Sequence, residues 1–92
     1  MRLMMQILIP VEKGNNAVAD GTMAAAMKKF SDLAKPEAAY FFVSEGKRAA
    51  IFIFDESDQA KLVQYNEPLF AALNADVRIT PVLVADELEG NL

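Results

Sequence analysis

The chain has 92 residues, a formal net charge of −4 at pH 7, and neither cysteine nor histidine. This length suits one domain, and the missing residue types exclude disulfides, cysteine-based zinc sites and the commonest ligand of transition metals. The acidic balance excludes nucleic acid as a partner, because phosphate groups would repel it. The absence of cysteine fits the reducing cytoplasm, so we expect a cytoplasmic protein. We also expect neither a metal nor another cofactor. No signal peptide is expected, and no apolar run approaches the roughly 18 residues that a membrane span needs.

The apolar content is high for so short a chain. Hydrophobic residues make up 53% of the sequence, and the mean hydropathy is +0.16. A small domain has a large surface relative to its volume and therefore needs many polar residues. The composition predicts apolar surface that is either left exposed or covered by a partner subunit.

The first third of the sequence predicts a strand and a helix. Residues 3–11 (LMMQILIPV) are almost continuously apolar, which indicates a strand buried on both faces. The polar residues 12–16 predict a turn, and Asn15 or Asn16 is expected to cap a helix that runs to about Ala34. Pro36 then ends the helix.

Residues 38–44 (AAYFFVS) and 48–54 (RAAIFIF) flank the turn Glu45-Gly46-Lys47 and predict a β-hairpin. Both arms are apolar on both faces. A hairpin with one face in water normally alternates apolar and polar residues. The sequence therefore predicts that both faces of this hairpin are covered.

The last third predicts helical segments and a closing strand. The run 55–58 (DESD) offers helix caps, and Pro68 is expected to divide the following helix into residues 58–65 and 67–73, with Asn66 capping the second part. Residues 77–84 predict the last strand, and Pro81, which cannot donate to a ladder, indicates either a sheet edge or a bulge. The acidic tail 86–92 is expected to fray.

The order βαββαβ predicts an α+β, ferredoxin-like domain spanning residues 1–92, with its core in residues 3–85. Its four-stranded antiparallel sheet would carry helices on one face and leave the other uncovered. A one-residue slip exchanges the two faces of a strand, so Phe41 and Ile51 remain alternatives to Tyr40 and Phe52. The residues expected in a dimer interface on the uncovered face are Met4, Leu8, Tyr40, Phe52 and Val82.

Four segments resemble the dimeric α+β barrel superfamily, especially its small single-domain members of unknown function. They are MQILIPV, AAYFFVSEGKRAAIFIF, LVQYNEPLFAAL and DVRITPVLV, within residues 3–85. The resemblance implies that two sheets pack face to face across a two-fold axis, and that a pocket lies between sheet and helices. Enzymes of the superfamily include heme-degrading and polyketide-type monooxygenases, muconolactone-isomerase-like enzymes and dehydratases. Several depend on histidine, which this chain lacks, and no catalytic residue carries over.

Tyr40, Arg48, Arg78 and Thr80 are the candidate ligand-binding residues, because arginine and tyrosine can hold an anionic or carbonyl-bearing small molecule. In the alternative interpretation Arg48 is solvated, while Arg78 pairs with Asp76, Glu37 or an acid of a partner chain. The run 55–58 lacks the spacing of a calcium loop and fits helix capping better than metal binding.

These observations favour a homodimer that binds a small apolar or anionic molecule, or serves as an assembly module, without catalysis of its own. One alternative is a cofactor-free isomerase, lyase or oxygenase acting on a small apolar or aromatic substrate. Another is a module that presents its sheet to a different protein. The substrate, the pathway and any assembly beyond a dimer do not follow from the sequence.

Overall fold

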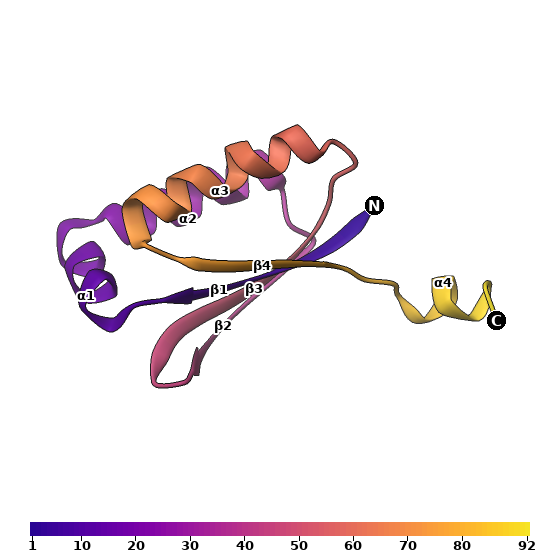
Figure 1. Cartoon of the computed structure of the whole chain (residues 1–92), viewed down its shortest axis with the longest axis horizontal. Helices are drawn as coiled ribbons and strands as arrows, with labels where there is room; N and C mark the ends of the chain where they lie inside the picture. The colour runs from indigo at the N-terminus through magenta and orange to yellow at the C-terminus, as the bar shows by residue number, and fades with distance from the viewer.

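A computed structural model describes residues 1–92. It contains four strands and four helices around one sheet (Figure 1). In chain order the elements are β1 (Arg2–Ile9), α1 (Val11–Asp20), α2 (Thr22–Ala34), β2 (Ala38–Ser44), β3 (Lys47–Asp55), α3 (Gln59–Leu73), β4 (Asp76–Pro81) and α4 (Ala85–Glu89).

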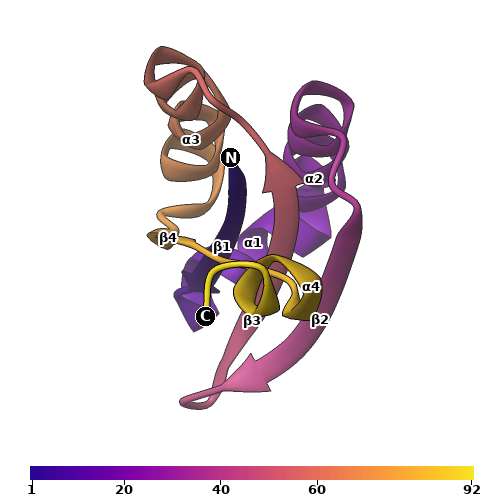
Figure 2. The ribbon, with the colours of Figure 1, turned by 90° about the vertical axis from the view of Figure 1, so that its right-hand side faces the viewer.

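The sheet is antiparallel throughout, with the strand order β2-β3-β1-β4. Helices α2 and α3 lie side by side over the same face of this sheet (Figure 2). The predicted four-stranded antiparallel α+β domain is thus confirmed, and its strand order is compatible with a ferredoxin-like arrangement. Pro81 lies in β4 at one edge of the sheet, as expected for a residue that cannot donate to a ladder.

We call the sheet face beneath α2 and α3 the closed face. Alternate residues of the central strands β1 and β3 point into it and are almost fully buried: Leu3, Met5, Ile7, Ile9, Ala50, Phe52 and Phe54. Phe30 of α2 packs on them, with its ring centroid 4.6 Å from that of Phe52 and 5.7 Å from that of Phe54. These apolar contacts form the core of the domain.

The first helical region differs from the prediction. Helix α1 begins at Val11, directly after Pro10, and the backbone N–H of Gly14 donates to the carbonyl of Pro10 at 2.8 Å. The residues predicted to form a turn are therefore helical, because proline is compatible with a helix start. Gly21, at φ 84°, separates α1 from α2, since glycine enters this left-handed region without a steric penalty.

Pro68 does not divide α3, contrary to prediction. The helix runs from Gln59 to Leu73 with Pro68 inside it. An internal proline costs about 3 kcal/mol, whereas full burial of a leucine contributes about 1.5–3 kcal/mol. Leu69 and Leu73, both 0% exposed, follow the proline on the buried side of the helix. Their packing outweighs the lost hydrogen bond and keeps the helix continuous.

The C-terminal segment is also more ordered than expected. Strand β4 ends at Pro81, and α4 projects beyond the end of the sheet (Figure 1). Arg2 holds it in place by donating to Glu87, whose carboxylate also accepts from the backbone N–H of Val84. Residues 86–89 of the tail that was expected to fray therefore belong to a short helix. None of the helices combines the length and apolarity required to cross a bilayer.

Candidate functional site

The sheet face opposite α2 and α3, which we call the open face, has an apolar centre. Its central side chains come from the alternate residues of β1 and β3: Met4, Leu8, Ala49, Ile51 and Ile53. Gln6 is the one polar residue among them. On β2, Tyr40 is 62% and Phe42 is 37% exposed. No helix of the chain packs over this face, because α2 and α3 lie on the other side of the sheet and α4 lies beyond its end (Figure 1).

Three of the predicted interface residues, Met4, Leu8 and Tyr40, lie on the open face. The placement of Phe52 there is wrong. Phe52 pairs with Met5 across the β1–β3 ladder and is 1% exposed in the core. Its neighbour Ile51 takes the place on the open face, because successive residues of a strand point to opposite sides.

Val82 follows the last residue of β4, and its backbone N–H donates to the carbonyl of Arg2 at 3.1 Å. Val82 therefore continues the hydrogen bonding to β1 one residue beyond the end of β4. The open face thus consists mainly of residues from β1, β2 and β3.

The structure does not bring the four predicted ligand-binding residues together. Tyr40 belongs to β2 at one edge of the sheet, whereas Arg78 and Thr80 belong to β4 at the other edge. Three interstrand spacings of about 4.8 Å separate those edges, so the distance is about 14 Å. Arg48 points to the closed face, since it pairs with Ile9. The single site predicted from these residues is therefore wrong.

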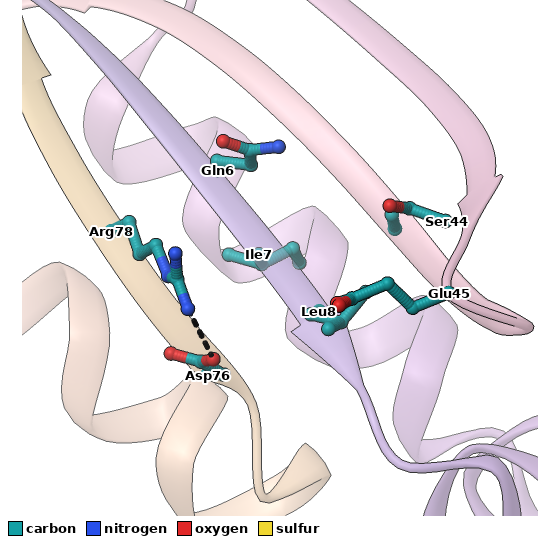
Figure 3. A pocket seen from close by; sticks show the side chains of 8 residues that line it. Gln6, Ile7, Leu8, Ser44, Glu45, Asp76 and Arg78 are labelled. Carbon is teal, nitrogen blue, oxygen red and sulfur yellow. Dashed lines mark ion pairs between the residues drawn. The ribbon is translucent and has the colours of Figure 1, made fainter.

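Arg78 lines a small hollow on the open face near the β2–β3 turn, together with Gln6, Ser44, Glu45 and Asp76 (Figure 3). Its guanidinium lies 3.6 Å from the carboxylate of Asp76, which is one of the pairings that the sequence suggested. The hollow has a volume of about 70 Å³. Ligand pockets are typically about 300 Å³ or larger, so this hollow is too small for an organic ligand.

A larger cavity, the helix-side pocket, lies between the sheet and helices α1 and α2. Its volume is about 270 Å³, close to the lower limit for small-molecule sites. The helices contribute Val18, Met23 and Met27 to its lining. The sheet contributes Ile9, Phe41, Phe42, Arg48, Ala49 and Ala50.

The pocket exists because the helices cover the edge strand β2 incompletely. Phe41 and Val43 point to the closed face, yet they are 66% and 77% exposed. The ring of Phe41 still packs edge-on against Phe52, with centroids 5.8 Å apart. The space beside Phe41 consequently remains open to a ligand.

Arg48 is the only charged residue that lines the helix-side pocket. It is half-buried, and its Nη1 donates to Asn15 Oδ1 at 3.1 Å. None of the ion pairs in the structure involves Arg48. Gly14 lies against the guanidinium, since a Cβ atom at this position would be 2.8 Å from Nη1. The sequence identified Arg48 but missed the contribution of α1, because residues 14–16 were interpreted as a turn.

The groups with shifted pKa values lie elsewhere. The hydroxyl of Tyr65 donates to Glu56, which lowers the pKa of Glu56 and, together with burial, raises that of Tyr65 to about 12. The N-terminal ammonium lowers the pKa of Asp55 at 2.6 Å, and Thr22 lowers that of Asp20. These interactions fix loops and helix ends, and none of the residues lines the helix-side pocket.

The acidic run before α3 also has a structural role. Asp58 is the N-cap of α3 and accepts from the backbone N–H of Ala60 at 2.9 Å, while Glu56 accepts from the N–H of Asp58. The capping interpretation is confirmed. No group of three or more acidic side chains in the chain is arranged to hold a metal ion.

No protein-family model and no curated protein matches this sequence. Among solved structures, the chain is similar to one titled "De novo designed protein Ferredog-Diesel", with a TM-score of 0.52 and 8% sequence identity. The match covers 88% of this chain and 85% of that chain. At this identity the likeness concerns the fold alone, and it supports a small α+β domain with a four-stranded antiparallel sheet.

Proposed function

We propose that the protein is a homodimeric α+β barrel that binds a small molecule and has no catalysis of its own. In this dimer two copies pack their open faces together, and each keeps its own helix-side pocket. The observation that carries the dimer is the apolar centre of the open face, which includes Met4, Ile51 and Ile53, in a chain with no element over it. Large exposed apolar patches mark interaction surfaces.

The charges on the open face favour a second copy as the partner. Lys47, Arg78 and Arg2 are cationic, Asp55 and Asp76 are anionic, and all five lie at the ends or edge of the sheet. The chain as a whole carries a net charge of −4. This face has both signs around an apolar centre, so opposite charges of two copies can meet across it. Such a distribution suits a symmetric interface with a polar rim.

The lining of the helix-side pocket favours binding over catalysis. General acid–base catalysis needs a group that gains or loses a proton near the working pH. The pocket is lined by Arg48 and eight apolar residues, and none of them is an Asp, Glu, Lys or Tyr that could act as a general acid or base. Binding of an apolar molecule with one polar group is what this arrangement supports.

Size-exclusion chromatography with light scattering tests the dimer at micromolar concentration. The wild-type protein is expected at twice the mass of one chain, and Ile51→Asp is expected at the mass of one chain. Val63→Asp is the matched control, because Val63 is 59% exposed on α3, away from the sheet. A monomeric wild-type protein, or a dimeric Ile51→Asp variant, would contradict the proposed interface. Native mass spectrometry of the same sample tests for a co-purified ligand.

A further inference from the structure

We infer that the helix-side pocket binds a monocarboxylate with a short apolar body, and that Arg48 is the residue that binds the carboxylate. This inference rests on the proposed binding function and adds the ligand class to it. It also assigns positioning roles to Asn15 and Gly14 of α1, which the sequence did not single out for binding.

The charge of Arg48 has no anionic partner in the chain. Its guanidinium has five N–H donors. One contact, from Nη1 to Asn15 Oδ1 at 3.1 Å, is the only side-chain hydrogen bond it makes. The residue is half-buried and lines an apolar cavity whose side chains offer no acceptor for its remaining donors. A bound carboxylate would accept two parallel N–H donors and neutralise this charge.

The apolar residues of the pocket determine the size and polarity of the part of the ligand that lies away from the carboxylate. Phe41, Met23 and Met27 present an aromatic ring and two flexible thioether side chains to the cavity. Methionine adapts to differently shaped apolar groups, so the pocket suits either a short alkyl chain or one aromatic ring. The volume of about 270 Å³ matches a body of this size. Apolar surroundings and a single cation together select an amphipathic monoanion.

Gly14 and Asn15 hold the guanidinium in place. Asn15 accepts a hydrogen bond from Arg48, and Gly14 leaves the space that a Cβ atom would take at 2.8 Å from Nη1. Alanine is the better helix former, so Gly14→Ala would favour α1 intrinsically while displacing the guanidinium. Glycine at this position leaves room for the guanidinium and for Ile9, whose Cγ2 would lie 3.4 Å from the added Cβ atom.

The first test is titration calorimetry of the wild-type protein with octanoate and with octanol, which has the same chain but no charge. Octanoate is expected to bind about tenfold or more tightly than octanol, since a hydrogen-bonded charge pair would be lost with octanol. Arg48→Gln is expected to lose this preference. Lys47→Gln is the matched control, because Lys47 is the adjacent cation on the open face. Equal affinities for octanoate and octanol, or an equal loss in both variants, would overturn the assignment.

Gly14→Ala gives a second test that does not remove the charge. We expect an unchanged circular dichroism spectrum, weaker octanoate binding and unchanged octanol binding. Full octanoate affinity in this variant would contradict the positioning role. Ile51→Asp separates the inference from the proposed assembly. Because the pocket lies within one chain, a monomeric Ile51→Asp protein is expected to retain octanoate binding. No binding of octanoate by a dimeric wild-type protein would overturn the ligand class and leave the dimer standing.

Discussion

The two faces of the sheet are made from the same strands and are both apolar, yet only one is covered within the chain. Along β1, Leu3, Met5 and Ile7 are between 0% and 4% exposed beneath the helices. The residues that alternate with them, including Met4 and Leu8, are only half-buried on the open face. The closed face shows what the chain completes by itself. The open face shows apolar surface over which none of the four helices packs (Figure 1).

The largest expected effect is the loss of core packing beneath the helices in the variant Phe52→Ala. Phe52 contacts Phe30 and Phe41 and is 1% exposed, so its truncation leaves a cavity at the centre of the core. We expect a loss of about 3–5 kcal/mol in the free energy of unfolding. Urea denaturation measures this loss. Ile51→Ala on the opposite face is the comparison, and an equal loss in the two variants would show that the faces do not differ within one chain.

The next effect concerns the open face and follows from the proposed dimer. A homodimer is stabilised by mass action, so the urea midpoint of the wild-type protein is expected to rise with protein concentration. In Ile51→Asp the midpoint is expected to stay constant, because a buried charge prevents association. Denaturation at two concentrations a hundredfold apart measures both. A wild-type midpoint that does not change with protein concentration would show that the protein does not dimerise and that its open face is exposed to water.

A smaller effect is expected from the hydrogen bond between Tyr65 of α3 and Glu56, whose contribution to stability depends on pH. Tyr65 of α3 donates to Glu56, and the pKa of Tyr65 rises from 10.0 to about 12 while that of Glu56 falls below 4.5. The raised pKa of Tyr65 stabilises the fold below pH 10, and this contribution disappears as the pH rises through 12. The lowered pKa of Glu56 stabilises the fold above pH 4.5, and this contribution disappears as the pH falls through the folded-state value.

Tyr65→Phe is therefore expected to have a lower melting temperature than the wild type near neutral pH. At pH 3 the difference in melting temperature between the two proteins is expected to be smaller. Thermal denaturation at pH 3 and pH 7 makes the comparison. A deficit that is independent of pH would assign the effect of the hydroxyl to packing rather than to its bond with Glu56.

The smallest effect concerns the start of the same helix. Asp58 caps α3 by accepting from the backbone N–H of Ala60. Asp58→Ala is expected to lower the free energy of unfolding by about 1 kcal/mol. Asp58→Asn serves as the control, since asparagine caps helices about equally well. A loss of similar size in both variants would indicate that the charge, and not the cap, matters here.

The sequence by itself determined the elements whose signal is local. The β2–β3 hairpin follows from two apolar runs around Glu45-Gly46, and Pro81 narrowed the position of β4 to a sheet edge or a bulge, of which the structure has the edge. The N-cap Asp58 was also predictable, because capping depends on one side chain and the next turn of backbone.

Tertiary structure decided what depends on contacts between distant segments. Whether Ile51 or Phe52 faces the helices depends on the register with β1, and strands that are apolar on both faces do not encode this choice. The continuity of α3 through Pro68 depends on the burial of Leu69 and Leu73 in the core. Only the folded chain brings Arg48 beside Asn15, 33 positions away in the sequence, because an α-helix must pack across a strand before the two side chains can meet.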